Sequence, residues 1–308
     1  MRIAFVFPGQ GSQSVGMLSG FAGNETVAGV MARADEALGF SLTGLIAEGP
    51  AETLSLTVNT QPAMLASSVA FYEAWLAAGG RTPEMMAGHS LGEYSALCAA
   101  GAMSLETAVR LVRFRAEAMQ SAVPVGVGGM AAVIGLADDV EAAVAEARET
   151  GRVEAVNFNA PGQVVIAGEK AAVARAIECA KALGCRRAIE LPVSAPFHSS
   201  LMQPAADKLA ARLVETEIQV PAIPVIANID VEVHETPDAI REALARQAAG
   251  AVQWVRTIER MKAAGITDIV ECGPGKVLTG LLRRTAPEIN GHNIFDAASL
   301  AAVLEKLN

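Results

Sequence analysis

Short apolar runs that end in glycine or polar residues alternate with longer helical stretches along the chain. The run IAFVF at residues 3–7 is followed directly by PGQGSQ, and PEMMAGHS ends in a similar way at residue 90. Runs of this length before glycine-rich segments predict buried strands that end in loops. TQPAMLASSVAFYEAWLAAGG, with a turn-like start at residue 60, and LGEYSALCAAGAM predict helices. The alternation predicts an α/β protein.

Residues 126–195 have a pattern of their own. GMAAVIGL, VEAVNFN, QVVIAG and CRRAIELPV predict strands, and DDVEAAVAEARET and KAAVARAIECAKALG predict helices. The resulting order, βαββαβ, is that of the split βαβ, ferredoxin-like unit. We therefore expect a small subdomain at 126–196, inserted into a large domain formed by 1–125 and 197–308. IPVIANID and DIVECGPG predict further buried strands of the large domain.

Composition and charge exclude several classes of protein. The chain has 308 residues, of which 52% are apolar, and a net charge of −9. That balance argues against a nucleic-acid binder, and no segment is apolar enough for a membrane span or a signal peptide. The four cysteines form no C-x-x-C pair and predict reduced thiols in a cytoplasmic protein. The scattered cysteines and histidines also show no metal-ligand spacing, so no metal site is expected.

The segment GHSLGEYSAL places Ser90 between Gly88 and Gly92, in the pattern Gly-x-Ser-x-Gly. A predicted strand before it and a predicted helix after it are the setting of a nucleophile elbow. The backbone N–H of Leu91, at the helix N-terminus, could then face a developing oxyanion, and the N–H of Gln10 in the first glycine loop could supply a second donor. The pattern alone also fits a polar residue in a glycine-rich loop.

A serine nucleophile needs a base, and His198 is the preferred candidate. His89 is adjacent to Ser90, so its side chain should point away on a sharp turn. His198 has apolar neighbours and lies where the chain leaves the small subdomain, a boundary at which clefts form. His234 and His292 lie in polar, loop-like segments. Each of these residues could instead be a surface or capping histidine.

Arg115 lies on the apolar side of a predicted helix. In TAVRLVRFRAEAMQSA it follows Leu111 and Val112 by four and three residues, whereas Arg110 falls on the other face. A guanidinium on a buried face needs an anion. The partner could be a structural Asp or Glu, which the spacing alone favours, or a substrate carboxylate held by two hydrogen bonds.

These motifs together resemble the malonyl-CoA:acyl carrier protein transacylases of fatty acid synthesis. The likeness runs along nearly the whole chain and includes FVFPGQGSQ, TQPA, AGHSLGEYSAL, NFNAPGQVVIAG, HSSLMQPA, AVQW and ECGPGKVLTGL. It implies an α/β-hydrolase-like core with an inserted ferredoxin-like subdomain. It also implies an S-malonyltransferase with malonyl-CoA and acyl carrier protein as partners and with no metal or redox cofactor.

The resemblance also implies a role for each matching residue. Ser90 would be the nucleophile that becomes acylated, and His198 its base. Arg115 would hold the malonyl carboxylate, which reverses the preference for a salt bridge. The remaining implied residues are Gln10 and Leu91 for the oxyanion hole, Gln61 of TQPA for substrate binding, and Gln247, whose carbonyl would orient His198 in place of a triad acid.

Two further positions bear on this comparison. Ala-Ala-Gly-Ala follows Gln247, where the family more often has bulkier residues and proline, which predicts a looser loop beside His198. Phe197 precedes the histidine, and in related polyketide acyltransferases phenylalanine there accompanies malonyl use. Three alternatives stay open at this point: a serine hydrolase, an acyltransferase that serves a polyketide synthase, and a binding module without catalysis.

Overall fold

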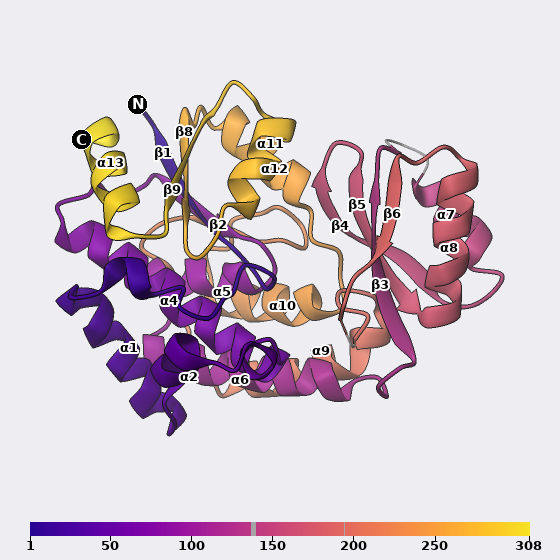
Figure 1. Cartoon of the computed structure of the whole chain (residues 1–308), viewed down its shortest axis with the longest axis horizontal. Helices are drawn as coiled ribbons and strands as arrows, with labels where there is room; N and C mark the ends of the chain where they lie inside the picture. Colours follow the sequence, from indigo (N-terminus) through magenta and orange to yellow (C-terminus); the bar gives the residue numbers. More distant parts are fainter. Residues whose placement is uncertain (137–139, 194) are drawn as a thin grey trace.

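Two separate sheets organise the protein (Figure 1). The computed structural model describes residues 1–136, 140–193 and 195–308. Within these residues, a five-stranded sheet has the order β7 (Val225–Ile226), β2 (Met85–Gly88), β1 (Ile3–Phe7), β8 (Asp268–Cys272) and β9 (Asn290–Ile294). All of its neighbouring strands are parallel. A four-stranded sheet has the order β4 (Val153–Ala160), β5 (Gln163–Glu169), β3 (Gly128–Ile134) and β6 (Arg187–Glu190), and its pairs are antiparallel. The fold is therefore mixed α/β.

Some helices precede β3 in the sequence, and the others follow it. Those before β3 are η1 (Ser19–Phe21), α1 (Glu25–Leu38), α2 (Leu42–Glu48), α3 (Ala51–Leu54), α4 (Thr57–Ala77), α5 (Leu91–Ala99) and α6 (Leu105–Ser121). Those after it begins are α7 (Val140–Ala147), α8 (Lys170–Ala182), η2 (Ser200–Met202), α9 (Gln203–Val214), α10 (Pro237–Ala248), α11 (Trp254–Ala263), α12 (Val277–Thr285) and α13 (Ala297–Leu307). Among the described residues, no helix is long and apolar enough to cross a membrane.

Helices cover both faces of the parallel sheet, as its continuous apolar strands require. In β1, Phe5 and Phe7 pack into the core that contains α1, α4, α5 and α6. The alternate residues Ala4 and Val6 pack into a second core with α11 and α12. Figure 1 shows these two groups of helices on opposite sides of the sheet. The central strand is thereby fixed from both sides, and the loops at its carboxyl end start from a rigid base.

The antiparallel sheet packs its own two helices on one face. Val133 of β3 and Ile166 of β5 share a core with α7 and α8, which Figure 1 shows at the outer side of the sheet. The order β3, α7, β4, β5, α8, β6 confirms the predicted sequence of elements. The start of the predicted helix, at Asp138 and Asp139, lies outside the described residues. The division of the chain into 126–196 and the remainder stays a prediction.

Two local predictions were wrong. The helix expected to start near Thr60 begins at Thr57, and Pro62 lies inside it. Proline has no N–H to donate, but Pro62 is in the second turn, so the helix loses one internal hydrogen bond and continues. The segment that contains His292 was expected to be a loop. It forms β9, because its backbone pairs in parallel with β8 over residues 268–272.

Candidate active site

Ser90 lies on a sharp turn between β2 and α5, as the sequence predicts. Its φ of 53° and ψ of −107° are outside the regions that a serine ordinarily adopts. Neither flanking glycine has room for a side chain. A Cβ on Gly88 would lie 1.8 Å from the carbonyl carbon of Gly92, and a Cβ on Gly92 would lie 2.0 Å from the carbonyl oxygen of Phe7. The Gly-x-Ser-x-Gly pattern therefore reflects close backbone approach at a strained strand-to-helix turn.

His198 contacts Ser90 directly. Its Nε2 lies 2.7 Å from Ser90 Oγ, and its Nδ1 lies 2.8 Å from the backbone carbonyl oxygen of Gln247. A carbonyl can only accept, so Nδ1 carries the proton and the lone pair of Nε2 faces the serine hydroxyl. Burial, together with the nearby charge of Arg115, lowers the pKa of His198 to about 3. The imidazole is thus neutral at physiological pH and can accept the hydroxyl proton.

Arg115 is buried beside the same hydroxyl. The residue is 1% exposed, and its guanidinium donates from Nη2 to Ser90 Oγ at 3.2 Å and to Gln247 Oε1 at 2.9 Å. Nη1 donates to Gln61 Oε1 at 2.9 Å, and Nε has no hydrogen-bond partner among the described residues. Burial lowers the pKa of Arg115 from its ordinary value.

The salt bridge that helical spacing favoured for Arg115 is absent from the described residues, where no carboxylate lies within 4.0 Å of its guanidinium. Its hydrogen-bond partners are two neutral amides and a hydroxyl, and it also lies over the neutral ring of Tyr94. A buried cation whose direct partners are all neutral still lacks an anion in direct contact. The arrangement therefore provides a place for an anion beside Ser90.

The loop after β1 packs against the turn at Ser90. A Cβ on Gly9 would lie 2.6 Å from the carbonyl oxygen of His89, so the two backbones are in contact. Gln10 follows in this loop, and its Oε1 accepts a hydrogen bond of 2.8 Å from Thr57. Leu91 is the first residue of α5. Within the described residues, the backbone N–H groups of Gln10 and Leu91 have no hydrogen-bond acceptor, and their role as an oxyanion hole stays a prediction.

Sequence reasoning missed Asn228, which is fully buried and supports the turn. Its Oδ1 accepts the backbone N–H of Ser90 at 2.7 Å, and its Nδ2 donates to the carbonyl of Gly88 at 2.7 Å. Asn228 follows β7, which pairs in parallel with β2, so both strands end at the same edge of the sheet. Its position just after a predicted strand was the available signal.

The predicted loop around Gln247 is a helix end. Gln247 is fully buried in the last turn of α10, where both its side chain and its carbonyl have partners. Gln247 itself is thus held by a helix, and the looser loop expected from the following Ala-Ala-Gly-Ala stays a prediction. Ser90, His198, Arg115, Gln247 and Gln61 form one connected hydrogen-bonded group.

The other histidines lie away from the reacting hydroxyl. His89 directs Nε2 to Asn159 Oδ1 on β4 at 2.7 Å. His292 pairs with Asp268 at 2.9 Å, and His234, expected to be exposed, has a side chain that is only 21% exposed. In residues 1–136, 140–193 and 195–308, no group of three or more His, Cys, Asp or Glu side chains could hold a metal ion.

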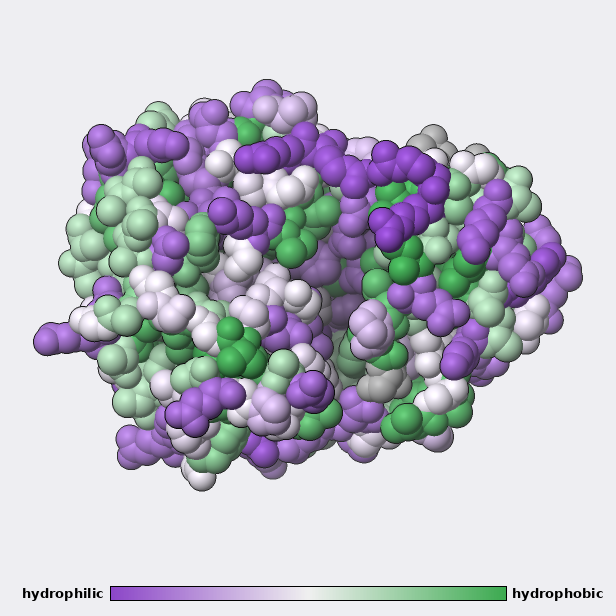
Figure 2. All heavy atoms as spheres, in the orientation of Figure 1, coloured by the Kyte–Doolittle hydropathy of each residue, from purple (hydrophilic) through white to green (hydrophobic). Residues whose placement is uncertain are grey.

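The site lies where the two sheets are joined. Ser90 follows a strand of the parallel sheet, whereas His198 lies on the segment that leaves the antiparallel sheet toward α9. Figure 2 shows a hollow in the surface between the larger part of the molecule and the part that contains β3–β6 in Figure 1. Arranged in this way, the residues can support acyl transfer through a serine, with an anionic group held nearby.

The whole chain is similar to proteins of one family. The acyl transferase domain family matches residues 4–305. The chain is 51% identical over 306 residues to the malonyl CoA-acyl carrier protein transacylase of Escherichia coli (strain K12), and the match covers 99% of each protein. It is 43% identical over 314 residues to the protein of the same name from Bacillus subtilis (strain 168), covering 99% of this chain and 97% of that one.

Two solved structures share the fold along their whole length. One is an acyl-carrier-protein S-malonyltransferase from Burkholderia pseudomallei 1710b, with a TM-score of 0.98, 57% identity, and coverage of 99% of this chain and 100% of that one. The other is a malonyl-transacylase in complex with a type II PKS acyl-carrier protein, with a TM-score of 0.98, 47% identity and the same coverage.

Proposed function

This chain belongs to the acyl transferase domain family, and we propose that Ser90, His198 and Arg115 perform its reaction. The protein transfers the malonyl group from malonyl-CoA to the thiol of acyl carrier protein, as an acyltransferase of fatty acid or polyketide synthesis. One observation supports the residue assignment above all. The guanidinium of Arg115, which has only neutral partners, lies 3.2 Å from Ser90 Oγ.

In the first half-reaction, His198 Nε2 takes the proton of Ser90 Oγ, and Oγ attacks the thioester carbon of malonyl-CoA. The oxyanion of the tetrahedral intermediate accepts the backbone N–H groups of Gln10 and Leu91. The C–S bond then breaks, and the sulfur of CoA leaves with the proton that His198 returns. The malonyl carboxylate stays on Arg115, so the acyl chain is held while the thiol departs.

The second half-reaction reverses these steps with a different thiol. His198 takes the proton of the phosphopantetheine thiol, and the sulfur attacks the malonyl ester. The C–O bond to Ser90 breaks, and His198 returns the proton to Oγ. The carbonyl of Gln247 holds Nδ1–H at 2.8 Å throughout and stabilises the imidazolium that forms twice in each cycle.

We also propose the finer description of the fold. The parallel sheet and its helices would be an α/β-hydrolase-like core of residues 1–125 and 197–308, supported by the strand-turn-helix at Ser90. Residues 126–196 would be a ferredoxin-like subdomain. Its support is the strand order β4-β5-β3-β6 combined with the element order βαββαβ.

Intact mass after mixing with malonyl-CoA tests the residue assignment. The wild-type protein should gain one malonyl group, and Ser90→Ala should gain none while it keeps its fold. His198→Ala should form the adduct ~10² to 10⁴-fold more slowly, because it lacks the general base. A Ser90→Ala protein that still takes up malonyl would show that the nucleophile is elsewhere.

A further inference from the structure

Glu93 is a buried carboxyl that the mechanism above does not use. It lies in the first turn of α5, three residues after Ser90, and is 2% exposed. Its Oε2 accepts two hydrogen bonds, one of 2.9 Å from the backbone N–H of Asn228 and one of 2.8 Å from Nε2 of Gln247. Buried acids without a structural or chemical task are rare, because their desolvation is costly.

Both partners of Glu93 continue to the reacting residues. Asn228 holds the backbone on either side of His89, directly before the reacting serine, through Ser90 N–H and the carbonyl of Gly88. The loop that contains Asn228 is itself strained, because Val231 has a φ of 65°. A β-branched residue rarely adopts this conformation, so outside contacts must keep the loop in place. The hydrogen bond from Asn228 N–H to Glu93 is one such contact.

Glu93 also determines which way the side-chain amide of Gln247 points. Nε2 of Gln247 donates to Glu93 and to the carbonyl of Ser90, and its Oε1 accepts from Arg115. A carboxylate can only accept and a guanidinium can only donate, so the reversed amide would lose both bonds. Glu93 and Arg115 therefore face opposite ends of one fixed amide.

We propose that Glu93 is a positioning residue of malonyl transfer, whose ionised carboxylate holds Asn228 and Gln247 and thereby aims Ser90, His198 and Arg115. This inference rests on the proposed function of those three residues. Hydrogen bonds to a charged acceptor are about twice as strong as neutral ones, so the charge on Glu93 matters as well as its shape. The side-chain amide of Gln247 separates the Glu93 carboxylate from Arg115. Glu93 therefore supplies a nearby negative charge without occupying the place of the substrate carboxylate.

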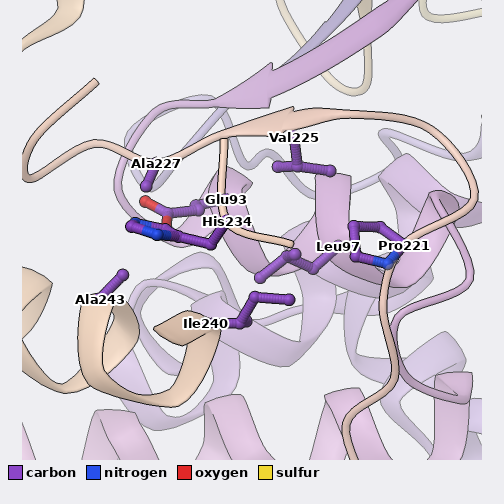
Figure 3. A pocket seen from close by; sticks show the side chains of 8 residues that line it. All are labelled: Glu93, Leu97, Pro221, Val225, Ala227, His234, Ile240 and Ala243. Carbon is purple, nitrogen blue, oxygen red and sulfur yellow. The ribbon is translucent and has the colours of Figure 1, made fainter. Parts of the chain in front are cut away.

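The surroundings of Glu93 let its charge change near neutral pH. Burial, with a smaller contribution from Asp230, raises its pKa to about 7 against the lowering effect of Gln247, Asn228 and Arg115. Across a cavity of about 10 Å³, His234 lines the same space as Glu93, and Figure 3 shows the two side chains entering it from α5 and from the loop before α10. Asp230 in turn contacts His234 at 3.4 Å and Arg246 at 3.6 Å.

The test measures the rate constant and the amplitude of malonyl-Ser90 formation by rapid quench and intact mass, at saturating malonyl-CoA, from pH 5.5 to 8.5. In the wild-type protein the rate constant should fall about tenfold between pH 8 and pH 6, with a midpoint near 7 and an unchanged amplitude. Glu93→Gln should show a flat profile at the lower plateau. A merely structural defect would instead reduce the amplitude, because unfolded protein forms no adduct.

Two matched variants serve as controls. Glu271 is also fully buried and accepts the backbone N–H groups of Leu278 and Thr279 at 3.0 and 2.7 Å, away from Gln247 and Asn228. The rate constant of Glu271→Gln should still fall between pH 8 and pH 6, whether or not the substitution lowers the stability of the protein. The rate constant of His234→Gln should also fall over this range. If Glu93→Gln is insoluble, Glu93→Asp, which retains the charge, should fold and retain a pH step at a lower rate.

The outcomes separate the inference from the function on which it rests. No adduct in the wild-type protein would contradict the proposed function. An adduct whose rate constant has no step near pH 7, or keeps that step in Glu93→Gln, would overturn the role of Glu93 alone. Loss of the step in His234→Gln or Glu271→Gln would assign the titration to another group and would overturn it equally.

Discussion

The parallel and antiparallel sheets bury different kinds of side chain. At the carboxyl edge of the parallel sheet, Glu93, Arg115 and His198 are each at most 4% exposed. In the described residues between 128 and 190, which contain the antiparallel sheet, the buried side chains are apolar except Asn157. Positive φ values at residues other than glycine follow the same division. They occur at Ser90, His198 and Val231, and none falls in the described part of 128–190.

This difference shows that the free-energy cost of forming the site is concentrated at the carboxyl edge of the parallel sheet. Each residue held in a sparsely populated backbone conformation costs about 1–3 kcal/mol, and buried charges add a desolvation cost. The apolar cores on both faces of the parallel sheet offset these costs, because they keep the strand ends fixed. The antiparallel sheet carries no comparable strain in its described residues. It can therefore supply a wall of the site and the segment that leads to His198.

The largest expected effect is that of replacing Arg115 at the carboxyl edge of the parallel sheet. Arg115→Ala should slow malonyl transfer at least about tenfold, since a hydrogen bond to a charged group contributes about 1.5–3 kcal/mol. Acetyl has no carboxylate and should lose little, so the malonyl-to-acetyl ratio of kcat/KM should fall. Arg115→Lys should lie between, because an ammonium cannot reproduce the two parallel bonds of a guanidinium.

Arg110→Ala is the matched control, because Arg110 is exposed on the same helix and should leave the ratio unchanged. An Arg115→Ala protein that folds and still prefers malonyl would show that another group selects the substrate. If Arg115→Ala fails to fold, the same ratio is measured with Arg115→Lys, and an unchanged ratio there would also contradict the assignment.

The two regions also differ in how far the sequence predicts them. The strands and helices of 128–190 follow from short-range patterns, since short apolar runs mark the strands and glycines follow the helices. The turn at Ser90 was predictable for a related reason, because the two glycines mark a close approach that only they permit. The serine and the strand-to-helix turn that carries it lie within one short segment of the sequence.

The support of the site was not predictable in this way. Asn228 contacts Ser90 across 138 residues of chain, and Gln247 contacts Glu93 across 154. Neither pair leaves a periodic signal, because each depends on which strands become neighbours. Helical spacing placed Arg115 on the buried face but suggested an acidic partner, since the spacing carries no information about the neutral amides of Gln61 and Gln247. The family resemblance implied roles for Gln61, Arg115 and Gln247 but none for Asn228.

A smaller effect would show which region receives the carrier protein. Carrier proteins of this pathway are typically acidic, and this chain has a net charge of −9, so docking needs a local basic patch. Arg186 and Arg187 are exposed at the start of β6, whereas Lys276, Arg283 and Arg284 are exposed around α12. Arg284 also bonds to Gln163 of β5, which places this second patch where the two sheets meet. We therefore expect docking at α12.

Charge reversal at both Arg283 and Arg284 should slow transfer to the carrier about three- to tenfold and reduce its salt dependence, because exposed charges each contribute up to about 1 kcal/mol. Acylation of Ser90 by malonyl-CoA should change little. Reversal at Arg186 and Arg187 is the matched comparison. A larger loss there would move the docking surface to the antiparallel sheet, and equal loss in both half-reactions would argue against a carrier-specific patch.

The smallest effect concerns a hydrogen bond that joins the two regions. Asn159 on β4 accepts from His89 Nε2 at 2.7 Å, directly beside the turn at Ser90. Asn159→Ala should destabilise the protein by about 1 kcal/mol and lower its Tm by about 2 °C, because one net hydrogen bond is lost. The rate constant of Ser90 acylation should fall less than about threefold, since Asn228 still holds the turn.

Asn159→Asp keeps an acceptor and should recover most of the Tm. If Asp destabilises as much as Ala, His89 is the acceptor and the amide nitrogen donates. If neither variant changes the Tm or the rate, this bond does not couple the antiparallel sheet to the site.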